Sequence, residues 1–118
     1  MKTYGITKME MANVGSGEGF KEAAENKVSG TLQGMGIIET QRLNEETGEL
    51  ETVNISVIKV NDTVYSGASK VIEGRIKNLA GIVGETSDIE DGKIDIAFEN
   101  IKLAKGTGTN MIVTRYTE

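Results

Sequence analysis

Five segments with strand-like alternation and one segment with helical spacing follow each other in this chain of 118 residues. The helical spacing lies between Ser69 and Val83, so three strand-like segments precede it and two follow it. Strands with one apolar face must bury that face against another element. A series of short strands separated by polar turns, with a single helix among them, therefore predicts an all-β domain with one helix.

The first predicted strand, residues 28–43, is long and contains glycines at positions 30, 34 and 36. Glycines within an apolar run indicate bends or bulges, which a strand that curves around a barrel requires. The polar residues 44–49 include a Thr-Gly pair and predict a hairpin loop. Residues 50–60 then alternate between apolar and polar side chains, which predicts a second strand with one buried face.

Asn61 and Asp62 predict a tight turn into a short third strand, residues 63–67. Val64 and Tyr65 are neighbours in this strand and must point to opposite faces. We expect Val64 to face the core. Tyr65 is then expected on the outer face.

The helix is predicted from a stripe of apolar residues spaced four, three and four apart, namely Ile72, Ile76, Leu79 and Val83. Ser69 is suited to cap its first turn, and Gly84 is suited to end it. Gly74 and Gly81 lie inside the segment, and each lowers helix propensity by roughly 1 kcal/mol relative to alanine. The helix therefore needs tertiary packing, and we expect it to cover one end of a barrel.

After a polar loop at 85–92, Ile94, Ile96 and Phe98 alternate as the core face of a fourth strand. Ile101 and Leu103 are shifted by one residue from this alternation, which predicts a bulge near residues 99–100. Residues 105–110 are rich in glycine and threonine and predict a loop. Residues 111–116 form the last predicted strand, which closes the sheet.

The order strand-strand-strand-helix-strand-strand is that of an OB-fold, a five-stranded and partly open barrel. We expect a single domain over residues 1–118, with residues 1–27 as an N-terminal extension. Within the extension, residues 4–9 are predicted to form an added edge strand, 15–19 a loop and 20–24 a short helical turn. A chain of this length buries about two-thirds of its surface, so its stability requires neither a disulfide nor a metal ion.

Acidic residues outnumber basic ones by 18 to 13, which gives a net charge of -5. Most of the excess lies in two predicted loops, residues 45–51 and 85–91. A weakly basic groove between these loops is compatible with this distribution, although the protein would not attract DNA from a distance as a basic protein does. No segment has the apolar core of a signal peptide or the roughly 20 apolar residues of a membrane span, so we expect a cytoplasmic protein.

The chain contains neither histidine nor cysteine. Ser-His and Cys-His nucleophile pairs and the usual zinc sites are therefore excluded. The glycine clusters fit neither a Walker phosphate loop nor a dinucleotide-binding motif, and Asp88, Glu90 and Asp91 lack the ligand spacing of a calcium loop. We expect no enzymatic activity and no cofactor.

A family resemblance is carried by the stretch IIETQRLNEETGELETVNISVIKVNDTVYSG and by the following SKVIEGRIKNL. Over roughly residues 28–116 the chain resembles the small single-stranded-DNA-binding proteins of tailed bacteriophages, of the type found in lactococcal phages. The resemblance implies an OB-fold protein that coats single-stranded DNA in phage replication or recombination, in the cytoplasm of the host cell. Phage or host proteins of replication and recombination are the partners that it implies.

Such binding needs aromatic rings that stack on bases and cations that contact phosphates. Tyr65 is the first candidate for stacking, with a partly buried structural tyrosine as the alternative, whereas Phe98 is expected in the core. Five cations lie on the predicted binding face or its bordering loops, with Lys102 as a weaker addition. They are Arg42, Lys59, Lys70, Lys105 and Arg115.

A single domain with few stacking residues binds DNA weakly, so we expect several copies to share one strand as a homo-oligomer. The alternative function is a phage protein-interaction module without nucleic-acid binding, either a structural protein or an inhibitor of a host factor or defence enzyme. The acidic surface and the few aromatic residues of this chain suit that alternative as well. The predicted fold does not decide between the two functions, because one fold can serve several functions.

Overall fold

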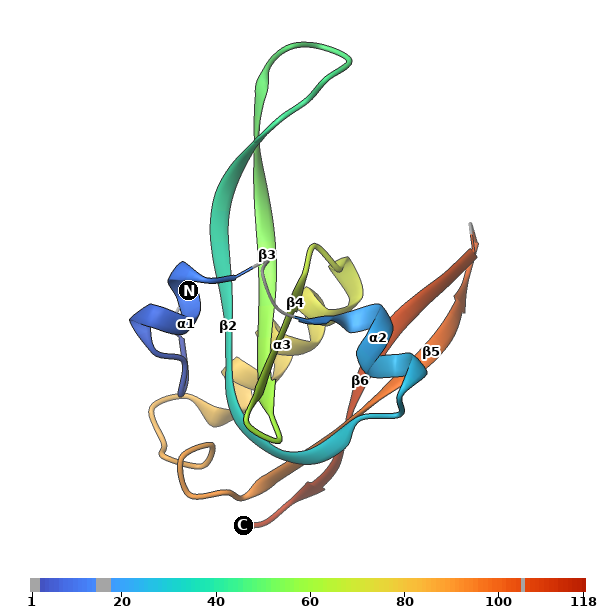
Figure 1. Cartoon of the computed structure of the whole chain (residues 1–118). Coiled ribbons are helices and arrows are strands. Elements are labelled where there is room, and N and C mark those ends of the chain that lie inside the picture. Colours follow the sequence, from blue (N-terminus) through green and yellow to red (C-terminus); the bar gives the residue numbers. More distant parts are fainter. Residues whose placement is uncertain (1–2, 15–17, 105) are drawn as a thin grey trace.

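The computed structural model describes residues 3–14, 18–104 and 106–118 (Figure 1). Its strands occupy most of the lengths predicted from the sequence, and the turn residues Asn61 and Asp62 both have the positive φ angles, 54° and 61°, of a two-residue hairpin. The elements in chain order are α1 (Lys8–Ala12), β1 (Glu18–Gly19), α2 (Phe20–Glu25), β2 (Ser29–Leu43), β3 (Leu50–Val60), β4 (Thr63–Gly67), α3 (Lys70–Val83), β5 (Ile94–Leu103) and β6 (Gly106–Tyr116).

The strands form one sheet in the order β1-β4-β3-β2-β5-β6. The five strands β2 to β6 are antiparallel to their neighbours, and the two-residue β1 runs parallel to β4. β2 joins the two halves of the sheet, because residues 29–31 pair with β5 and the rest of the strand pairs with β3. Among the described residues β4 and β6 do not pair, so the sheet curves without closing into a barrel.

Helix α2 packs against β4, β5 and β6, in the space that separates the two ends of the curved sheet (Figure 1). Phe20 of α2 is buried, and its carbonyl oxygen accepts a hydrogen bond of 3.3 Å from the Thr109 hydroxyl of β6. The predicted helical turn at 20–24 is thus confirmed.

Helix α3 confirms the prediction made from its apolar stripe, because Ile72, Ile76, Leu79 and Val83 are all buried. It packs against β2, β3 and β6. The Ser69 hydroxyl accepts a hydrogen bond of 3.2 Å from the backbone N–H of Ile72, and Gly84 ends the helix with a φ of 58°. Ile94, Ile96 and Phe98 of β5 complete the same core, as predicted.

The glycines of β2 do more than bend the strand. A bulge leaves Gln33 unpaired beside Gly34, as the glycine pattern predicted. A Cβ atom at Gly34 would lie 2.7 Å from the Tyr4 carbonyl oxygen, and one at Gly36 would lie 2.7 Å from the Thr3 side chain. The N-terminal segment therefore crosses β2 at a distance that only glycine permits.

The predicted edge strand at 4–9 is wrong except for one bridge, in which Tyr4 and Met35 exchange backbone hydrogen bonds of 2.8 Å. Lys8–Ala12 is instead helix α1, which starts with a capping box between Thr7 and Glu10. Local capping thus outweighs the short apolar alternation that favoured a strand. Of the loop predicted at 15–19, residues 15–17 lie outside the described residues, and Glu18–Gly19 forms β1.

Two further predictions for the C-terminal strands are wrong. The bulge lies between Asp95 and Ile96 rather than near residues 99–100, so Ile101 and Leu103 lie on the opposite face of β5 from the core. The predicted loop at 105–110 is mostly strand, because β6 begins at Gly106 and pairs continuously with β5 up to Val113. Lys105 lies outside the described residues.

The hairpin of β2 and β3 extends far beyond the rest of the molecule (Figure 1). We call residues 39–54 the arm. None of the residues in the arm is buried. No helix within the described ranges combines the length and apolar character that crossing a bilayer demands.

Candidate nucleic-acid interface

Two of the predicted cations, Arg42 and Lys70, meet in one cleft between the arm and the start of α3. The cleft has a volume of about 520 Å³. Arg42 reaches it from β2, and Lys70 reaches it from the first turn of α3, which the Ser69 cap holds in place. Among the described residues, neither cation forms an ion pair within 4.0 Å.

The same cleft also contains three carboxylates, those of Glu39, Glu51 and Glu73. Partial burial acts to raise the pKa of Glu73, but hydrogen bonds from Lys77 and Asn54 outweigh it and lower that pKa. Lys77 lies 3.4 Å from the Glu73 carboxylate and offsets its charge. The cleft is therefore polar and of mixed charge, which makes it suited to a small number of phosphate contacts rather than to strong anion binding.

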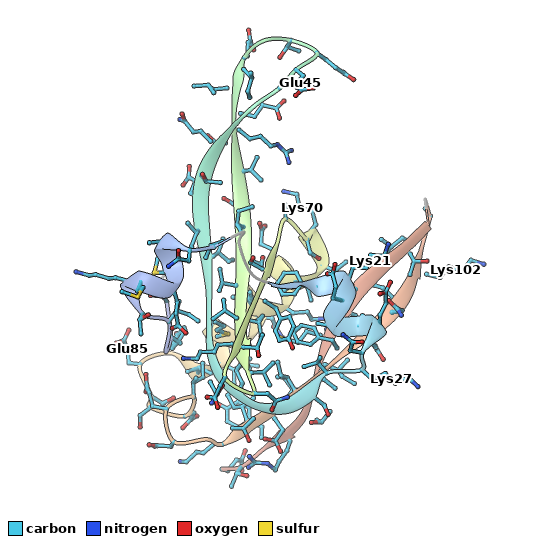
Figure 2. All side chains as sticks on the ribbon, viewed as in Figure 1. Lys21, Lys27, Glu45, Lys70, Glu85 and Lys102 are labelled. Atoms are coloured by element: carbon cyan, nitrogen blue, oxygen red, sulfur yellow. The ribbon has the colours of Figure 1, made fainter. Side chains whose placement is uncertain are left out.

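A second cleft of about 510 Å³ lies between α2 and the hairpin of β5 and β6, and Lys21 and Thr107 line it. Lys102 stands opposite Thr107 in the strand pairing. Figure 2 shows Lys70, Lys21 and Lys102 following each other along the upper side of the body, from the base of the arm toward the β5–β6 hairpin. We call Arg42, Lys70, Lys21 and Lys102 the cation row.

Lys59 and Arg115, two other predicted contacts, are held by carboxylates. The Lys59 ammonium lies 2.9 Å from the Glu10 carboxylate of α1. The Arg115 guanidinium donates to both carboxylate oxygens of Asp95, at 2.8 and 3.0 Å, and to the Gly92 carbonyl. The hydrogen bond from Arg115 lowers the pKa of Asp95, and the same contact raises the pKa of Arg115. Both cations are therefore already neutralised by a carboxylate of the protein.

Tyr65 lies in the core, with 6% of its surface exposed, and its ring packs 5.7 Å from that of Phe98. The predicted facing of Val64 and Tyr65 is therefore reversed: Tyr65 pairs with Ile58 on the inner face, while Val64 is half-buried beside Lys59. A ring enclosed in this way is not available to stack on a base, and the structural alternative for Tyr65 holds. Phe98 is a core residue, as predicted.

None of the five aromatic side chains is exposed. Tyr4, Phe20, Tyr65 and Phe98 are buried. Tyr116 is half-buried, and its hydroxyl donates a hydrogen bond of 2.5 Å to Asp88, which raises the pKa of Tyr116 to about 12. The interface thus offers cations and polar groups but no exposed ring.

Sequence reasoning missed Lys21. Its signal was present, because Phe20, Ala23 and Ala24 form the buried side of α2 and leave Lys21 on the exposed side. Lys102, the weaker candidate, lies on the same face of β5 as Asn100, which lines the second cleft, because β5 has no bulge at 99–100.

Two acidic residues of the 85–92 loop, Asp88 and Asp91, accept hydrogen bonds within the protein. Ser87 donates to Asp91, and Tyr116 donates to Asp88. In the part of the chain that the structure describes, no three acidic side chains are grouped as a metal ion would need. No family model matches the chain, and the comparisons with curated proteins and with solved structures found no match either.

Proposed function

We propose that this protein binds single-stranded DNA without sequence preference, along the cation row between its two long hairpins. The carrying observation is that Lys70, Lys21 and Lys102 lie along one side of the body (Figure 2) and, like Arg42 in the arm, form no ion pair within 4.0 Å among the described residues, whereas Lys59 and Arg115 do. Clefts at both ends of the row leave room for a flexible strand.

The fold that we propose is an open variant of the OB-fold. The order of the five long strands and of α3 supports this proposal, as does the sharing of β2 between the two halves of the sheet. In OB-folds, nucleic acid lies near the loop after the first barrel strand and the loop between the last two. The arm and the β5–β6 hairpin stand at the corresponding positions, and the cation row runs between them.

Binding of this kind depends mainly on phosphate contacts, because no exposed ring is available for stacking. Each contact with single-stranded DNA contributes about 0.7 to the slope of log affinity against log salt concentration, so four contacts predict a slope of about 3. The carboxylates of the first cleft weaken binding further. Coating of a strand then requires several copies. We propose that the protein has this role in phage replication or recombination, in the host cytoplasm, and that the role needs neither catalysis nor a cofactor.

The experiment is a fluorescence titration of labelled oligo-dT with the wild-type protein and with K70A, K21A and K102A, over a series of salt concentrations. Each substitution is expected to lower the salt slope by about 0.7. Duplex DNA of the same length should bind less tightly. K8A is the matched control, because Lys8 is an exposed lysine on α1, away from the row.

K59A tests the assignment of the row itself and is expected to leave the slope unchanged. Equal affinity for single-stranded and duplex DNA would contradict the proposal. So would wild-type salt slopes in all three row variants. In that case the alternative of a protein-interaction module gains support, because the arm is acidic and has exposed leucines at its tip.

A further inference from the structure

Two leucines are exposed at the end of the arm. Leu43 and Leu50 face each other across the hairpin pairing, with 56% and 66% of their surfaces exposed. Exposed apolar side chains are common singly, but a pair at the tip of a projecting hairpin forms a small apolar knob. The folding of the body does not require this knob, because no residue of the arm is buried.

A second set of exposed apolar residues lines a groove of about 390 Å³ between α3 and β6. Ile82 is 62% exposed, Val113 44% and Ile112 37%. The groove lies beside β6, the last strand of the sheet. Its apolar and aromatic lining consists of Leu79, Ile82, Met111, Ile112, Val113 and Tyr116.

The knob and the groove are both apolar, and their surroundings carry opposite charges. Between residues 39 and 54 the arm carries five carboxylates and one arginine, which gives a net charge of -4. Figure 2 shows Glu45 at the far end of the arm. Arg75 is the one charged residue among the described residues that line the groove. A knob of two leucines with surrounding carboxylates therefore matches an apolar groove with a cation at its side.

The arm cannot reach the groove of its own chain. Figure 1 shows the arm at one end of the molecule, while β6 runs away from it to the C-terminus at the other end. The body lies between them (Figure 1), so the arm of a chain does not reach its own α3 and β6. An arm that occupies this groove must then belong to another copy.

We propose that Leu43 and Leu50 of one copy dock into the α3–β6 groove of a second copy, head to tail. Such a contact joins two different surfaces, so a pair of copies still has one free arm and one free groove, and the assembly grows as a chain. This inference rests on the proposed function, because a head-to-tail row of copies is suited to coating a single strand of DNA. The contact is small and therefore weak in free solution, and it is strengthened when copies share one strand.

The test uses sedimentation velocity at increasing protein concentration, without DNA. Three proteins are compared: the wild type, an arm variant L43S/L50S and a groove variant I82S/V113S. We expect the mean mass of the wild type to rise with concentration beyond that of a dimer, and each variant alone to remain monomeric. An equimolar mixture of the two variants should form dimers and nothing larger, because it contains one functional arm and one functional groove for each pair.

M9S is the matched control, because Met9 is an exposed apolar residue that belongs to neither surface, and it should associate like the wild type. Thermal melts verify that the variants fold; if I82S/V113S does not, I82S alone replaces it. A wild type that is monomeric at every concentration would overturn the inference. Association of the arm variant with itself would overturn it too. Since the measurement needs no DNA, its result is independent of whether the chain binds DNA.

Discussion

Strand β2 belongs to two regions of opposite character. Its first half, up to Ile37, lies among β3, β5 and α3 and contributes Leu32 and Met35 to the core. Its second half forms one side of the arm, where no side chain is buried. An isolated two-stranded hairpin is marginally stable in water, so the body must hold the arm in place. The comparison teaches that the buried side chains that stabilise the fold and the exposed side chains lie in different halves of the same strand.

The largest expected difference between the two regions follows from truncation of an aromatic ring in the body. Phe98→Ala removes a ring that packs against both Phe20 and Tyr65. The free energy of unfolding should fall by about 3 to 5 kcal/mol, because the transfer free energy is lost and a cavity remains. Urea denaturation measures this change. A loss below about 1 kcal/mol would show that the three rings do not form the centre of the core.

A smaller effect is expected where the N-terminal segment crosses the body. Gly34→Ala places a Cβ atom 2.7 Å from the Tyr4 carbonyl oxygen and 2.8 Å from that of Gly5. The segment must shift, at a cost of about 1 to 3 kcal/mol. Gly74→Ala is the control, because a Cβ atom there meets no other atom within 4 Å, and it should stabilise α3 by about 0.5 to 1 kcal/mol. Equal effects of the two substitutions would contradict the close crossing.

The attachment of α1 to the body is expected to depend on pH. Hydrogen bonds from the Thr7 backbone and from Lys59 lower the pKa of Glu10 below its ordinary 4.5. A lowered folded-state pKa contributes stability above pH 4.5, and this contribution is lost as the pH falls through the folded-state value. Glu10→Gln should therefore reduce stability at pH 7 by less than about 1 kcal/mol, as for a partly exposed ion pair.

Denaturation of wild type and Glu10→Gln at pH 7 and pH 3 measures this dependence, and the difference between the two proteins should be smaller at pH 3 than at pH 7. An equal difference at both pH values would mean that the carboxylate charge is not what holds α1. Lys59→Met supplies a check, because it removes the same pair from the other side while keeping an apolar stem.

The smallest effect is expected in the arm. Leu50→Ala changes a side chain that is exposed and packs into no core, so the free energy of unfolding should change by no more than about 0.5 kcal/mol. Its consequence should be confined to the association of copies. A destabilisation comparable to that of Phe98→Ala would show that the arm is a cooperative part of the body, and the distinction between the two regions would fail.

Local patterns were sufficient for most of the secondary structure. The strands Leu50–Val60 and Thr63–Gly67, their turn and the buried stripe of α3 follow from alternation, capping and turn chemistry. The errors lie where a competing local signal was stronger, or where the sequence did not show which face of a short strand is buried. The capping box at Thr7 overrode a short alternation, and in the five residues of β4 the choice of which face is buried depended on the partner strand.

The candidate site shows the same division. The sequence by itself determined which residues are cationic, which lie on strands and that no histidine or cysteine chemistry is present. Only the tertiary structure decided which cations remain available, because Glu10 and Asp95 are brought to Lys59 and Arg115 from distant parts of the chain. It also enclosed Tyr65 and placed Lys21 beside the β5–β6 hairpin. Pairing and burial depend on contacts between residues far apart in sequence, and local periodicity carries no information about those contacts.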